Sequence, residues 1–129
     1  MLQVPLVNIY AAWIGFLFGC IAGAVPGLFF HNKSWLGGYT SWERRIIRLA
    51  HISFFGLGLI NLSFALTAKS LGLKTGLTTP SILLIIGAVT MPIVCYLSAW
   101  KNVARNVFFI PAGSVTVGIA LFLWRIFTL

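Results

Sequence analysis

Residues 12–31 read AWIGFLFGCIAGAVPGLFFH, in which glycine recurs at every fourth position and a histidine, His31, stands at the end. The glycines are Gly15, Gly19, Gly23 and Gly27. Residues four apart lie on one face of an α-helix, so one face of this helix carries no side chains. In lipid such a face lets another helix or a flat ligand approach closely. The pattern predicts a helix-packing face at these four glycines, with a candidate ligand site at the His31 end.

The composition is typical of an integral membrane protein. The 129 residues are 60% hydrophobic and 8% charged, and the mean hydropathy is +1.02. Crossing a bilayer takes about 20 apolar residues, and four segments are long enough: residues 8–30, 46–68, 81–100 and 107–127. Only short connectors remain, so we expect residues 1–129 to form a single integral-membrane domain. The predicted fold is an all-α, four-helix transmembrane bundle made of two helical hairpins.

The distribution of basic residues predicts the orientation. The first connector and its flank hold Lys33, Arg44, Arg45 and Arg48, and the third connector holds Lys101 and Arg105. The second connector holds only Lys69 and Lys74, and the last segment ends near Arg125. Basic residues favour the cytoplasmic side, which places the first and third connectors inside and both termini outside. We expect a multi-pass protein of a bacterial inner membrane.

The charged residues also limit the classes of function. The net charge is +8, and Glu43 is the only acidic side chain. Basic residues at helix ends meet anionic lipid headgroups, so we expect the bilayer, not nucleic acid, as the charged partner. Two-carboxylate hydrolysis and a Ser-His-Asp triad lack the acidic groups that they need. We therefore predict no catalytic residue and no enzymatic activity of the chain alone, although it can serve as a non-catalytic subunit of an oxidoreductase complex.

A second candidate feature lies in the segment 46–68 and its flank. Arg44, Arg48, His51, Phe55 and Gly58 are spaced by three or four residues and share one helix face. His51 lies about 8 Å inside the membrane, where an ionisable side chain indicates a function. His31 closes the first segment at the same, inner surface. Adjacent antiparallel helices would let the two histidines face one another.

Two neutral imidazoles can hold a b-type haem iron between helices. In that interpretation His31 and His51 are the iron ligands, the bare surface at Gly23 and Gly27 admits the macrocycle, and arginines pair with its propionates. The cofactor-binding candidates are His31, His51, Arg44, Arg45, Arg48, Gly23 and Gly27. A quinone or a bound lipid near His51 and Arg48 is the alternative ligand.

Two classes of function lead, and behind them stand a transporter, which the lack of carboxylates within the spans disfavours, and a channel for an anion or a small neutral solute. Because the chain has almost no soluble part, we expect it to act with other membrane subunits. Its layout resembles that of the compact four-helix anchor subunits of respiratory complexes, including their inner-side histidines, although a fold does not fix a function. The paired inner histidines and arginines would suit a haem or a quinone, and this favours an electron-transfer complex. The alternative is a cofactor-free structural or assembly protein that acts through helix packing, since a glycine ladder in a membrane helix is often a packing face.

Polar residues within the predicted spans need hydrogen-bond partners, because an unsatisfied polar group is costly in lipid. Asn61, Thr90, Ser114 and Thr116 lie inside these spans. We expect most of them to form hydrogen bonds between helices.

Overall fold

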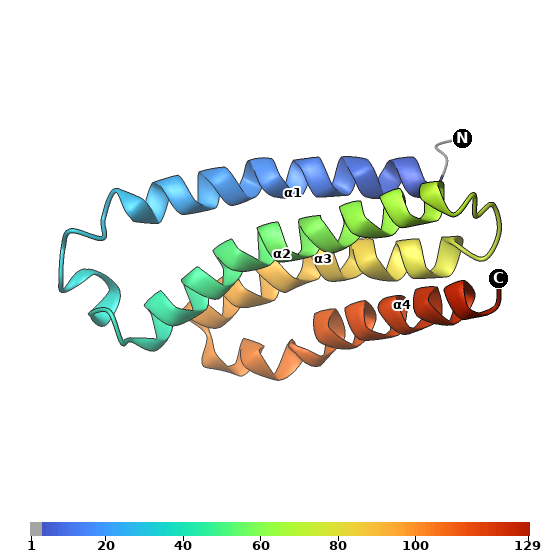
Figure 1. The fold of residues 1–129 in the computed structure, drawn as a ribbon. Coiled ribbons are helices and arrows are strands. Elements are labelled where there is room, and N and C mark those ends of the chain that lie inside the picture. Colours follow the sequence, from blue (N-terminus) through green and yellow to red (C-terminus); the bar gives the residue numbers. More distant parts are fainter. Residues whose placement is uncertain (1–3) are drawn as a thin grey trace.

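The computed structural model describes residues 4–129 and consists mainly of four long α-helices (Figure 1). They are α1 (Val4–Gly27), α2 (Trp42–Ser70), α3 (Thr78–Trp100) and α4 (Phe109–Phe127), with the short 3-10 helices η1 (Trp35–Gly37) and η2 (Asn102–Val107) in the connectors. Residues 4–129 contain no strand. All four helices, the last taken together with η2, are long and apolar enough to cross a membrane. The prediction of an all-α chain with four such helices is confirmed.

The start of α2 shows how local chemistry extends a helix beyond its apolar segment. The helix begins at Trp42, not at residue 46. Ser41 caps it by accepting a hydrogen bond from the Arg44 amide at 3.2 Å, and Glu43 lies in the first turn, where a negative charge is favourable. The Ser41 hydroxyl also donates to the Leu36 carbonyl at 2.6 Å. The cap therefore fixes both the helix start and the path of the connector before it.

The helices pack in chain order (Figure 1). α2 lies between α1 and α3, α3 lies between α2 and α4, and α1 contacts α3 only over a short region. α1 and α4 therefore form the two flanks of the bundle. Toward η1, α2 slopes away from α1 (Figure 1). The end of the bundle that holds η1 and η2 is termed the η1 end, and the end that holds the connector 71–77 is termed the opposite end.

The apolar core lies mainly between α2 and α3. Near the opposite end it contains Phe64 and Leu84, and near the η1 end it contains Ile46, Ala50 and Cys95. Large apolar side chains cover the outer faces of the flanking helices, as expected for a lipid environment. At the opposite end, α4 is fastened to the connector 71–77 by a hydrogen bond of 3.2 Å from Arg125 Nε to the Thr75 carbonyl.

A buried polar cluster joins three helices near the opposite end. Asn8 of α1 and Asn61 of α2 are fully buried, and Ser81 of α3 is nearly so. Asn8 Nδ2 donates to Asn61 Oδ1 at 2.7 Å, and the Ser81 hydroxyl donates to Asn8 Oδ1. Asn61 Nδ2 in turn donates to the carbonyls of Leu57 at 2.9 Å and Leu84 at 3.3 Å. The cluster therefore fixes the relative positions of α1, α2 and α3.

The interhelical hydrogen bonds predicted from the sequence are confirmed for two of the four residues, and Thr116 of α4 is exposed. Asn61 belongs to the cluster described above, and Ser114 of α4 donates to the Leu83 carbonyl of α3 at 2.6 Å. The prediction was wrong for Thr90, whose hydroxyl donates to the Ile86 carbonyl of its own helix at 2.7 Å. Threonine can satisfy its hydroxyl within its own helix in this way, so it needs no partner helix.

We expect the substitution Asn8→Leu to lower the free energy of unfolding by about 1–2 kcal/mol, because it leaves Asn61 and Ser81 buried without their partner. Thr90→Val is the matched control, since the Thr90 hydroxyl bonds only within α3. Unfolding in mixed micelles with increasing SDS measures both variants. Equal midpoints for Asn8→Leu and the parent protein would contradict the stabilising role of the cluster.

Candidate functional site

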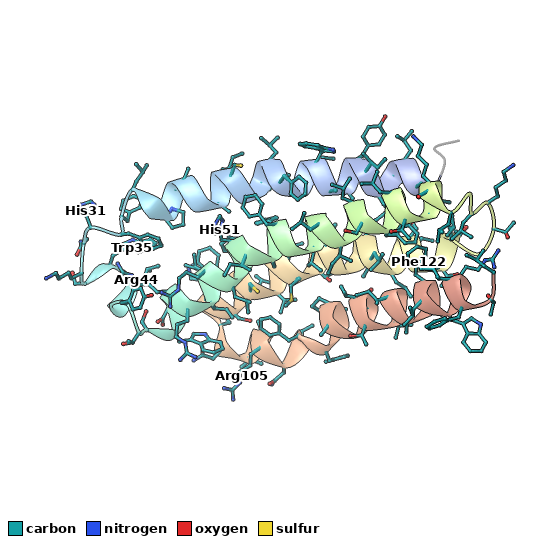
Figure 2. The ribbon with its side chains drawn as sticks, in the orientation of Figure 1. His31, Trp35, Arg44, His51, Arg105 and Phe122 are labelled. Atoms are coloured by element: carbon teal, nitrogen blue, oxygen red, sulfur yellow. The ribbon has the colours of Figure 1, made fainter. Side chains whose placement is uncertain are left out.

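His51 lies in the third turn of α2, and its imidazole packs against Gly23 of α1 (Figure 2). A Cβ atom added at residue 23 would lie 2.5 Å from His51 Cε1. The ring also meets Phe55 edge to face, with ring centroids 5.4 Å apart. The imidazole therefore fits between the two helices because Gly23 has no side chain.

A cavity of about 220 Å³ adjoins this contact. It is lined by Ala22, Gly23, Pro26, Phe30, Ile47, Arg48, His51 and Ile52. We term this cavity the His51 pocket. Its lining on the α1 side comes from the last turns of that helix, which ends at Gly27, and from Phe30 just beyond it. Arg48 and His51 are its two ionisable side chains, and its other lining residues are apolar.

The two ionisable groups of the His51 pocket differ in how well they are satisfied. His51 Nδ1 is buried and has no hydrogen-bond partner among the described residues. The Arg48 guanidinium lies 4.4 Å from the centroid of the Tyr39 ring, and its Nη2 donates a long hydrogen bond of 3.5 Å to the Tyr39 carbonyl. A buried, unsatisfied imidazole nitrogen is costly and calls for a partner. The pocket therefore suits a mainly apolar ligand that carries hydrogen-bonding oxygens.

His31 lies apart from this site. It is exposed, four residues beyond the end of α1, in the turns that lead to η1. Figure 2 shows it in the loop at the η1 end, whereas His51 lies beneath α1. The structure therefore does not bring the two predicted haem ligands face to face.

The described residues do not fit a haem held between these two histidines. A bis-histidine haem needs an imidazole on each face of the macrocycle, with the iron between them. Here the His51 ring lies directly against Gly23, so the macrocycle has no space at that point of the α1–α2 contact. His31, which would supply the second ligand, is exposed in the loop.

The three arginines predicted to surround a cofactor have different positions. Arg44 is only 5% exposed, and its Nη2 donates to the Asn32 carbonyl at 2.7 Å. Its guanidinium lies 5.3 Å from the centroid of the Trp35 ring, so Arg44 fastens the first connector to α2. Arg45 is exposed. Of the three, Arg48 alone lines the His51 pocket.

The glycines of the ladder face α2 of the same chain, with one exception. A Cβ atom at Gly15 would lie 3.2 Å from the Phe54 carbonyl oxygen, and one at Gly19 would lie 2.7 Å from the Phe55 ring. A Cβ atom at Gly27 would meet nothing within 4 Å in residues 4–129. Most of the bare face is therefore used inside the chain, where α1 and α2 pack, and Gly27 lies past the end of that contact.

A larger groove lies between α1 and α3, and Phe54 and Gly58 of α2 contribute to its lining. Its volume is about 600 Å³, and its lining is almost wholly apolar. The small residues Ala11, Gly15, Gly58 and Ala88 give the groove its depth. We term it the α1–α3 groove. It depends on the spacing of two helices that are not neighbours in sequence, which no local pattern specifies.

Some residues of the His51 pocket have only a weak signal in the sequence. Ile47 precedes His51 by four residues and Ile52 follows Arg48 by four, so helical spacing places each beside a candidate residue. Many other apolar residues of this chain share such spacings. The sequence therefore gives no reason to select these two.

Comparisons with protein families, with curated proteins and with solved structures give no match. The functional interpretation therefore rests on the residues and geometry of this chain. The site with the most distinct chemistry is the His51 pocket, whose lining combines two ionisable residues, Arg48 and His51, with apolar residues.

We expect Gly19→Leu to lower the free energy of unfolding by about 1–3 kcal/mol, because the new side chain would enter the space of the Phe55 ring. Gly27→Leu is the matched control, since nothing within residues 4–129 lies close to a Cβ atom at that position. Unfolding in mixed micelles compares the two variants with the parent protein. The same loss of stability in both would show that the ladder does not act through the α1–α2 contact.

Proposed function

We propose that this chain is a small integral-membrane subunit of a respiratory-type electron-transfer complex, and that its His51 pocket binds the headgroup of a quinone. The observation that carries the proposal is that His51, whose buried Nδ1 has no hydrogen-bond partner within residues 4–129, lines a pocket together with Arg48. Partner subunits of the complex would supply the redox centres that exchange electrons with the quinone.

The chemistry of the pocket supports a quinone over a charged ligand. A quinone headgroup is flat and neutral, and its two carbonyl oxygens accept hydrogen bonds. An imidazole N–H and a guanidinium are donors suited to these oxygens. Phe30, Ile47 and Ile52 supply apolar walls for the ring. A phosphate group would instead favour several basic side chains and a more hydrated site.

The charge distribution supports a cytoplasmic location for the His51 pocket. The first connector and the nearby turns of α2 carry more basic residues than the connector 71–77. By the positive-inside rule, the η1 end faces the cytoplasm and both termini lie outside, in a bacterial inner membrane. The exposed Lys33 and Arg45 would then meet anionic lipid headgroups.

The outer faces of the flanking helices support docking to other membrane subunits. Trp13 of α1 is 63% exposed, and Phe109 of α4 is 72% exposed. Lipid covers such faces in an isolated chain, and helices of partner subunits can replace it. With one carboxylate in the whole sequence, the chain has few groups for chemistry of its own, which suits an anchoring and ligand-binding role.

A cofactor-free structural or assembly protein is the second candidate. The close packing of Gly15 and Gly19 on α2 favours it, because the glycine ladder then needs no ligand to explain it. In this case the His51 pocket holds a bilayer lipid without selectivity. The two candidates differ in whether the pocket recognises a quinone headgroup.

We expect His51→Ala and Arg48→Ala each to weaken binding of a short-chain benzoquinone about five- to tenfold, because each removes one hydrogen bond to a quinone oxygen. His31→Ala and Arg45→Ala are the matched controls, since both residues lie outside the pocket and are exposed. Calorimetric titration of the purified full chain in detergent, with any co-purifying subunits retained, measures the affinities.

Equal binding by the parent protein and both pocket variants would contradict the proposed site. A reduced-minus-oxidised visible spectrum of the same preparation tests the haem interpretation. A b-type haem signal that is lost in both His31→Ala and His51→Ala would replace the quinone proposal with bis-histidine ligation.

A further inference from the structure

The His51 pocket borders a larger apolar cavity, which in turn borders the α1–α3 groove. The larger cavity, of about 420 Å³, shares Ala22, Pro26 and Ile47 with the pocket. This cavity also shares Phe18, Phe54 and Tyr96 with the α1–α3 groove. The three cavities are therefore adjacent in series, from His51 and Arg48 to the space between α1 and α3, and we term this series the path.

The path is long enough to reach through most of the membrane. On α1 its lining extends from Pro26 to Val7, which is about 28 Å along the helix axis. The hydrocarbon core of a bilayer is about 30 Å thick. A ligand confined to the His51 pocket would fill only the first part of this path.

The path is polar at one end and apolar along the rest, which matches an amphiphilic ligand with a long tail. Its ionisable side chains, Arg48 and His51, lie at one end. Beyond them the lining is almost wholly apolar, and Ala11, Gly15, Gly58 and Ala88 make room for a chain in the groove. A transmembrane helix of a partner could cover the groove, but it could not follow the path into the His51 pocket between α1 and α2.

The geometry points to a quinone with a long isoprenoid tail, which lies in the α1–α3 groove while its headgroup occupies the His51 pocket. This inference rests on the proposed function, because it assigns the tail of the same ligand. It adds that the chain distinguishes long-tailed from short-tailed quinones. A long tail would raise the affinity of the quinone through packing contacts with the groove. Transfer of the tail out of the lipid adds little, because the lipid is as apolar as the groove.

Binding of a short-chain and a long-chain benzoquinone to the full chain in nanodiscs tests this inference. We expect Ala88→Phe and Ala11→Phe, on opposite walls of the groove, to reduce the long-to-short affinity ratio about fivefold. Ala120→Phe on the exposed face of α4 is the matched control, and its ratio should equal that of the parent. Comparing ratios between variants cancels the partition of each quinone into the bilayer.

A photoreactive group at the end of the long tail gives an independent readout. We expect it to label the segments that line the groove, residues 7–18 of α1 and 85–96 of α3, and to spare α4. Labelling spread evenly over all four helices would overturn the inference, and so would an affinity ratio that the groove variants leave unchanged.

The remaining outcomes separate this inference from the proposed function. If both quinones bind with equal affinity, the headgroup site stands and the tail assignment is wrong. If neither quinone binds, the proposed function itself fails. If the groove variants keep the affinity ratio but lose a co-purifying subunit, the groove holds a partner helix. Retention of a phospholipid in native mass spectrometry, lost in Ala88→Phe, would assign the groove to an acyl chain instead.

Discussion

The hydrogen bonds among Asn8, Asn61 and Ser81 hold α1, α2 and α3 together where water cannot replace them. In lipid, apolar burial gives little drive for helices to associate, because the tails are as apolar as the side chains. Close packing and buried polar contacts must therefore determine the arrangement. The cluster places these contacts near the opposite end, and the packing of Gly15 and Gly19 against α2 continues from there along α1.

The η1 end is built differently. α1 stops at Gly27 and its direction departs from that of α2 (Figure 1). Arg44 fastens the first connector to α2 through the Asn32 carbonyl and the Trp35 ring. This attachment fixes the connector without closing the space between the two helices. The helices are held together at the opposite end and diverge toward the η1 end. This divergence leaves the space for the His51 pocket.

This arrangement relates the fold to the proposed function. A ligand that reaches the site from the bilayer needs an apolar route and a small number of polar groups at its end. In the proposed function the α1–α3 groove would provide the route, and His51 and Arg48 would provide the polar groups. The glycine at position 23 has a local role in this site, because it makes room for the imidazole between two helices.

The sequence by itself determined the four helices, because each needs only a long run of apolar residues. It also identified Asn61 and Ser114 as interhelical donors, since a buried polar group in lipid requires a partner. Helical spacing alone could not determine whether His31 lies opposite His51. The position of His31 depends on where α1 ends and on the course of the connector that follows it. Only the tertiary structure placed Asn8 against Ser81 and Gly23 against His51, and left a groove between α1 and α3. These relations join residues far apart in the chain, and they depend on how whole helices pack, which no local pattern records.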